Sequence, residues 1–149
     1  QDVTASSKIL LSGRTAAPEE VAKFFGTETN VPHTHLRRLR LGDGEPYSID
    51  DGWYNAAYVP NLLENDVYNS VYNILDTDFD VPITEADQTV TAIAADAEVA
   101  DLLEVDPGTP LLHIIRHSRS RDKPVEWCSS VYRTDRYRLT TRVVRALEP

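Results

Sequence analysis

The chain of 149 residues has one cysteine, no methionine and no long run of apolar residues. A single cysteine excludes an internal disulfide framework and favours a reducing compartment. No run approaches the ~20 apolar residues of a transmembrane helix, and no basic-then-apolar signal peptide opens the chain. These absences predict a soluble, cytoplasmic protein with no membrane partner. Because the chain starts at Gln1 without a methionine, we expect it to be a fragment of a longer protein.

Basic residues are also scarce. The chain has 15 Lys and Arg against 24 Asp and Glu, which gives a formal net charge of -9. That sign is wrong for a chain that wraps nucleic acid by itself, so we expect any DNA contact to lie outside these residues. The length fits one globular domain with a substantial core, and no second domain is expected.

The sequence motifs of several enzyme and metal-site classes are missing. No glycine-rich phosphate loop, G-x-S-x-G elbow or H-E-x-x-H motif occurs, which removes the sequence support for nucleotide cradling, serine hydrolysis and zinc proteolysis. The histidines alternate or lie four apart on predicted strands, unlike a compact metal motif. Cys128 has no adjacent histidine to activate it. We therefore predict no catalytic residue, no cofactor and no metal site.

Hydrophobic periodicity and turn residues divide the chain into short elements. Alternating or β-rich patterns predict strands, and apolar spacings of three and four predict helices. Because strands and helices do not alternate as βαβ units, we predict an α+β fold with an antiparallel sheet covered by helices. The predicted strands are residues 8–11, 34–41, 46–58, 81–95, 111–120, 125–133 and 139–144, and the predicted helices are residues 18–26, 67–75 and a segment that begins after residue 96.

Local signals support several of these boundaries. Residues 42–44 and 121–124 have the composition of hairpin turns. Pro18 is typical of a first helical position, Asn65 or Asp66 is suited to cap the second helix, and Asp96 is suited to cap the third.

Two arginines on one predicted strand are the main candidates for a binding function. Alternation places Leu36, Arg38 and Arg40 on one face and Leu39 and Leu41 on the other. An arginine fork matches a carboxylate or phosphate in a bidentate way. The same pattern is also compatible with a solvated edge strand.

A polar face on a later strand complements the arginines. Glu126, Cys128, Ser130 and Tyr132 share one face of residues 125–133, while the other face has Val and Trp side chains. Carboxylates such as Glu126 and Asp50 accept hydrogen bonds from hydroxyl or ammonium groups, and a tyrosine both donates and accepts. Together with the arginines, these residues favour a small polar ligand with an acidic group.

Residues of the second predicted helix are less specific. Ser70 would lie in its first turn, where free backbone N–H groups favour phosphate, although the spacing alone favours an ordinary exposed helix residue. Tyr68 and Tyr72 lie four apart, and that spacing favours packing over ligand contact.

Four segments of the sequence carry a family resemblance. They are HLRRLRLGDGEPYSIDDGWY, NSVYNIL, ITEADQTVTAIAADAEVADLLEVDPGTPLLHIIRHS and KPVEWCSSVYRTDRYRL. Together they resemble the UTRA effector domain of HutC-type GntR bacterial transcription regulators. The resemblance covers nearly the whole chain, residues 1–149, as a single domain. It implies a six-stranded antiparallel sheet of the chorismate-lyase-like (UTRA) fold with a pocket on one side, and a homodimer.

The same resemblance implies roles for six residues. In members that sense sugar phosphates, paired arginines and a serine at a helix start hold the phosphate, and these positions fall on Arg38, Arg40 and Ser70. The sugar hydroxyls are met by an acid of the second strand, a glutamate and a tyrosine. These last three positions fall on Asp50, Glu126 and Tyr132, and Asp50 is one methylene shorter than the expected glutamate.

The resemblance also implies a function. It predicts a ligand-sensing and dimerisation domain that binds a small anionic metabolite, a sugar phosphate or an organic acid. Operator DNA would be contacted only through an N-terminal winged helix-turn-helix domain that is absent from this chain. Two alternatives remain: a chorismate-lyase-like small-molecule enzyme on the same fold, and a dimerisation module with a vestigial pocket. Convergence of Arg38, Arg40 and Glu126 on one cavity would favour sensing.

Overall fold

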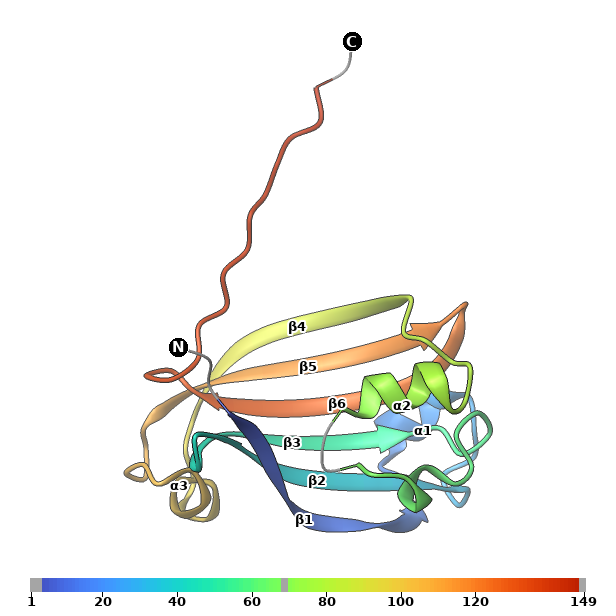
Figure 1. Cartoon of the computed structure of the whole chain (residues 1–149), viewed down its shortest axis with the longest axis horizontal. Helices are drawn as coiled ribbons and strands as arrows, with labels where there is room; N and C mark the ends of the chain where they lie inside the picture. Colours follow the sequence, from blue (N-terminus) through green and yellow to red (C-terminus); the bar gives the residue numbers. More distant parts are fainter. Residues whose placement is uncertain (1–3, 68–69, 148–149) are drawn as a thin grey trace.

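The structure is a computed structural model that describes residues 4–67 and 70–147, and these residues form one six-stranded antiparallel sheet (Figure 1). Across the sheet the strand order is β1-β2-β3-β6-β5-β4. The α+β class and the antiparallel pairing expected from the sequence are confirmed. The strands are β1 (Ala5–Ala16), β2 (Pro32–Gly42), β3 (Glu45–Tyr54), β4 (Glu85–Ala94), β5 (Pro110–Ser120) and β6 (Lys123–Arg133).

Both predicted hairpins are present. Asp43 and Gly44 join β2 to β3 with φ angles of 51° and 78°, and Arg121 and Asp122 join β5 to β6 with φ angles of 48° and 71°. Two successive residues with positive φ give the turn whose twist matches a two-residue hairpin. The two hairpins lie side by side because β3 pairs with β6, so the centre of the sheet consists of strands that are distant in sequence.

Three short helices cover parts of the two sheet faces: α1 (Glu19–Phe25), α2 (Val71–Thr77) and α3 (Ala97–Leu103), with a 3-10 turn η1 at Leu62–Glu64. α1 follows Pro18 and ends at Gly26, whose φ is 73°. α3 begins after Asp96, whose carboxylate accepts a hydrogen bond from the Val99 amide. These boundaries agree with the sequence prediction.

The helices divide between the faces according to strand alternation. α2 and η1 pack with Leu36 and Tyr54, on the face that also has Arg38. α3 packs on the opposite face, with Leu39 and Ile49, and α1 packs there with Trp53. α2 is only 7 residues long, and a cavity lies between it and the sheet.

The second helix begins later than predicted. α2 starts at Val71, and neither Asn65 nor Asp66 caps it. Ser70 is the cap instead, since its hydroxyl oxygen accepts a hydrogen bond from the Asn73 amide. Val67 is buried in the same cluster as the apolar residues of α2, so its spacing reflected burial rather than helix.

Strand boundaries also differ from the prediction. β1 extends over 12 residues because its backbone pairs with β2 along nearly its whole length. β3 ends at Tyr54, where Asn55 turns the chain, instead of continuing to residue 58. Residues 139–144 form no strand, because within the described structure they pair with no neighbour and remain exposed. In residues 4–67 and 70–147, no helix has the length and hydrophobicity needed to cross a membrane.

Candidate functional site

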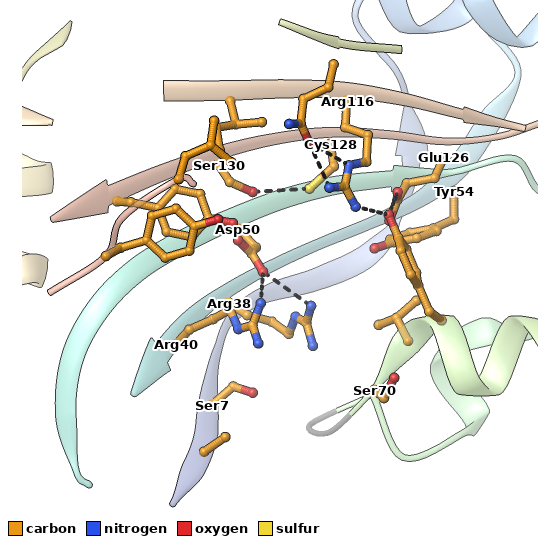
Figure 2. Close-up of a pocket in the computed structure, with 18 of the residues that line it drawn as sticks. Ser7, Arg38, Arg40, Asp50, Tyr54, Ser70, Arg116, Glu126, Cys128 and Ser130 are labelled. Carbon is orange, nitrogen blue, oxygen red and sulfur yellow. Dashed lines mark hydrogen bonds and ion pairs between the residues drawn. The ribbon is translucent and has the colours of Figure 1, made fainter. Parts of the chain in front are cut away.

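A cavity of about 490 Å³ lies between the sheet and α2, and all six predicted site residues line it (Figure 2). Arg38, Arg40 and Glu126 converge on this one cavity instead of projecting into solvent. That arrangement is the one expected of a sensing site rather than of a vestigial pocket. The predicted residues are Arg38, Arg40, Asp50, Ser70, Glu126 and Tyr132.

Cross-strand register explains why residues from distant segments meet. Arg38 lies opposite Asp50, and Asp50 lies opposite Ser130 on the next strand. One row away, Tyr132 lies opposite Ser48. Side chains directly opposite each other on one sheet face lie about 5 Å apart at Cβ, so each row brings together one residue from each strand.

The arginine end of the cavity is partly neutralised by Asp50. Its Oδ2 atom accepts hydrogen bonds from Arg38 Nη2 at 3.5 Å and from Arg40 Nη1 at 3.4 Å. Arg38 Nη1 also donates to the Val67 carbonyl at 3.2 Å, and this contact ties β2 to the segment before α2. The two guanidinium groups therefore share one carboxylate at long distances, and such paired arginines suit an anion.

Asp50 therefore makes hydrogen bonds within the protein, in addition to the ligand contact predicted for it. Ser48 donates a hydrogen bond to Asp50 Oδ1 at 3.4 Å. The side chain is buried, and a buried carboxylate requires such partners to offset its loss of hydration. These three hydrogen bonds, from the two arginines and Ser48, use three of the roughly four acceptor positions of a carboxylate, which leaves one for an additional donor.

The acidic end of the cavity is centred on Glu126, which is only 2% exposed. Glu126 Oε1 accepts hydrogen bonds from the Tyr72 hydroxyl at 2.6 Å and from Ser118 Oγ at 3.0 Å. Burial raises the pKa of Glu126, and the hydrogen bonds from Tyr72, Ser118 and Tyr54 oppose that rise because they favour the ionised form. The pocket thus contains a desolvated acid surrounded by hydroxyl groups.

Tyr72 lies in the pocket, contrary to the sequence interpretation that its spacing reflects packing. Its hydroxyl donates to Glu126 and accepts a hydrogen bond from Arg116 Nη1 at 3.0 Å. Tyr68 lies outside the described residues. The helical spacing signalled a shared face but gave no information about what that face opposes.

Sequence reasoning also missed Arg116 and Gln88, which line the cavity from β5 and β4. Arg116 lies opposite Cys128 in the β5–β6 register and opposite Gln88 in the β4–β5 register. The available signal was alternation: because Cys128 shares the face of Glu126, any residue opposite it must share that face as well. The register itself was not available from the sequence.

Ser70 and Tyr132 complete the walls. Ser70 Oγ accepts the Asn73 amide hydrogen bond as helix cap, so its own O–H is left to donate. Burial raises the pKa of Tyr132 to about 12, and its ring stacks on Tyr137 at a centroid distance of 4.1 Å. Tyr137 and Leu139 belong to the segment after β6, which therefore forms part of the cavity wall.

Tyr54, which lines the cavity, approaches the backbone of its own strand closely at Gly52. A Cβ atom built there would lie 2.8 Å from the Tyr54 hydroxyl oxygen and 2.9 Å from its ring. Gly52 therefore permits the Tyr54 ring to lie over the strand and reach Glu126. Beside it, burial raises the pKa of the Cys128 thiol, so Cys128 is a protonated, weakly polar lining group.

A family sequence pattern, individual relatives and solved structures all relate this chain to the same group of proteins. The sequence pattern of the UTRA domain family matches residues 1–138. The histidine utilization repressor of Pseudomonas putida is 34% identical over 109 residues, which cover 72% of this chain and 43% of that protein. The chain spans about half the length of the curated relatives it matches.

Solved structures of the same fold support this relationship. The ligand-binding domain of a GntR-family regulator from Bordetella bronchiseptica has a TM-score of 0.85 and 31% identity, covering 95% of this chain and 90% of that one. The effector domain of PhnF from Mycobacterium smegmatis has a TM-score of 0.88 and 27% identity, covering 97% and 89%. The relatives are named repressors and regulators, so the family is regulatory rather than enzymatic. The chain belongs to the UTRA family, the regulatory domain of HutC-type repressors and other GntR-family transcription regulators.

Proposed function

We propose that this domain senses a small anionic metabolite, a sugar phosphate or an organic acid, in the cavity between the sheet and α2. The observation that carries the proposal is the convergence of Arg38 and Arg40 on a cavity whose other end has the buried Glu126. A phosphate or carboxylate would exchange the long arginine contacts with Asp50 for shorter bidentate ones.

The remaining predicted residues would orient the rest of the ligand. Ser70 donates its free O–H to the anion, while Asp50, Glu126 and Tyr132 meet its hydroxyl groups. The cavity of about 490 Å³ falls in the usual range for small-molecule sites. Its lining is rich in charged and hydroxyl side chains, which favours a polar metabolite over a long acyl chain.

Binding would modulate DNA recognition by a separate domain. We infer a cytoplasmic homodimer in which each chain has a winged helix-turn-helix domain before this one, and only that domain contacts operator DNA. The ligand would favour one arrangement of the dimer and change the spacing of the two DNA-binding domains. The size of that change is limited by the difference in ligand affinity between the two arrangements.

The proposal is tested by a binding screen of this chain. Sugar phosphates, organic acids, urocanate and phosphonates are added in a thermal-shift assay, and hits are followed by calorimetry. Ligand at a hundredfold its dissociation constant should stabilise the fold by ~2.7 kcal/mol. The Arg38→Ala, Arg40→Ala double variant should lose the shift.

A matched control comes from the same strand. Arg37 lies on the opposite face of β2 and pairs with the exposed Glu98 at 2.9 Å. Arg37→Ala removes one arginine charge of the same strand without touching the cavity and should keep the shift. Equal loss in both variants, or no response to any anion, would contradict the proposal.

A further inference from the structure

A third arginine enters the cavity from the side opposite to Arg38 and Arg40. Arg116 projects from β5, which is separated from β2 by β3 and β6. Three strand spacings correspond to about 14 Å across the sheet. Figure 2 shows Arg116 above the cavity and Arg38 and Arg40 below it, with all three side chains directed inward.

The partners of Arg116 differ in kind from those of the other two arginines. Its Nε and Nη2 atoms donate to the Gln88 side-chain oxygen at 3.2 and 2.7 Å, and Nη1 donates to the Tyr72 hydroxyl at 3.0 Å. The Gln88 amide is neutral. The Tyr72 phenol is also neutral, because burial raises its pKa above the ordinary tyrosine value, which already lies above neutral pH. Arg38 and Arg40, by contrast, share the Asp50 carboxylate.

No carboxylate of residues 4–67 or 70–147 forms an ion pair with Arg116. Glu126 makes no direct hydrogen bond to Arg116: the Tyr72 hydroxyl lies between them, accepting from Arg116 and donating to Glu126, and the two charges attract each other through space. A guanidinium has five N–H donors. The three hydrogen bonds given above therefore leave two donors for a ligand.

The contacts also fix the direction of the guanidinium. Gln88 lies opposite Arg116 in the β4–β5 register and receives two of its N–H groups, and Tyr72 approaches from α2. A planar fork held on two sides loses little further entropy when it binds an anion. Arg116 is thus a positioned positive charge whose direct hydrogen-bond partners are neutral and whose nearest acid, Glu126, acts on it only through space and through Tyr72.

We propose that Arg116 forms a second anion subsite and that the effector is a small molecule with two anionic groups. One group is held by Arg38 and Arg40, and the other is held by Arg116. Effectors of this kind are short dicarboxylates and phosphorylated carboxylic acids. The arginines extend into the cavity from opposite sides, so the two anionic groups lie closer together than the strand separation. The inference rests on the proposed function, because both subsites belong to the same cavity.

The test uses pairs of probes that differ by one anionic group. 6-Phosphogluconate is compared with sorbitol 6-phosphate, 3-phosphoglycerate with glycerol 3-phosphate, and succinate with butyrate. Calorimetry on this chain should give at least tenfold tighter binding for the two-anion member of one or more pairs. Arg116→Gln should weaken binding of the two-anion member at least tenfold more than binding of the one-anion member, and so remove that preference.

Control variants separate a subsite from a structural role. Arg119 is on the same strand but pairs with Asp87 at 3.2 Å outside the cavity, so Arg119→Gln should leave both affinities unchanged. Gln88→Ala keeps the charge of Arg116 but removes its orienting partner, and it should reduce the preference partly. If Arg116→Gln does not fold, the inference is tested by the probe pairs on the unaltered chain and on Gln88→Ala. A preference for the two-anion probes that Gln88→Ala reduces supports the subsite, and no preference overturns it.

The outcomes distinguish the inference from the proposed function. Suppose that the two members of each probe pair bind the unaltered chain equally well, and that the Arg38→Ala, Arg40→Ala variant loses all binding. The second subsite is then wrong and the proposed function stands. Binding that survives the double variant contradicts the proposed function itself. Equal weakening of both probe types by Arg116→Gln, or no binding by any two-anion probe, also overturns the second subsite.

Discussion

The Tyr72 hydroxyl donates a 2.6 Å hydrogen bond to Glu126, although the two residues are 54 positions apart in the chain. The bond connects α2 to β6 across the cavity. Tyr72→Phe removes it and leaves a buried carboxylate with one fewer donor, so we expect a loss of roughly 1.5–3 kcal/mol in the free energy of unfolding, measured by urea denaturation.

A second tyrosine provides the control for this change. The Tyr58 ring lies under the Lys123 ammonium at 5.5 Å, and its hydroxyl has no hydrogen-bond partner in the part of the chain that the structure describes. Tyr58→Phe should change stability by less than about 0.5 kcal/mol. Similar losses for the two variants would mean that the Tyr72 bond does not stabilise the fold.

The buried Glu126 predicts a characteristic pH dependence. Its folded-state pKa is raised from 4.5 by burial, so the folded state holds the proton more tightly than the unfolded state. The associated stability is present below pH 4.5 and is lost as pH rises through the raised pKa, by about 1.4 kcal/mol for each unit of difference. Glu126→Gln lacks this loss. Unfolding free energies of the two proteins from pH 4 to 8 should diverge, and parallel curves would refute the prediction.

Two strand glycines should respond oppositely to alanine. At Gly52 a Cβ would overlap the Tyr54 ring, so Gly52→Ala should destabilise by ~1–3 kcal/mol and weaken ligand binding as Tyr54 shifts. At Gly13 nothing lies within 4 Å of the added carbon, and alanine there should be neutral or slightly stabilising. Thermal unfolding of both variants checks this, and equal effects would exclude the proposed steric conflict.

Ser70 combines capping with a position in the cavity, and two substitutions separate these roles. Ser70→Ala should cost about 1 kcal/mol because the Asn73 amide loses its acceptor. Ser70→Asp should restore the cap and the stability, yet it should weaken anion binding by placing a negative charge at the cavity. Stability and affinity are measured in parallel on both variants. Recovery of affinity in Ser70→Asp would contradict a role for the Ser70 hydroxyl in binding the anion.

Local chemistry made some elements predictable and left others hidden. α1, α3 and both hairpins have their own signals in Pro18, Gly26, Asp96 and the turn residues, and these boundaries were found from sequence. α2 was placed too early because Val67 continues its apolar spacing while lying outside the helix. Apolar periodicity reports which residues are buried, and it does so equally for a helix and for a loop that packs beside it.

The site was predictable only within single strands. Alternation put Arg38 with Arg40, and Glu126 with Tyr132, on defined faces, and the structure brings these faces together. Alternation does not give the order of the strands in the sheet, so the pairing of β3 with β6 and the approach of Arg116 could not be derived from the sequence. The contact of Tyr72 with Glu126 has the same origin, since it depends on where α2 lies over the sheet.

The alternation of β2 has a consequence for how this domain can diversify. Arg37 and Arg38 are adjacent in sequence, yet one pairs with α3 on the far face and the other lines the cavity. Substitutions at every second position of the central strands thus alter ligand recognition without entering the cores beneath α1 and α3. On the cavity face itself, Leu36 and Tyr54 pack beneath α2, so only the positions that open into the cavity, such as Arg38 and Arg40, are separated from the packing of the fold. Ligand recognition can therefore change at these positions while the cores beneath α1 and α3 stay intact.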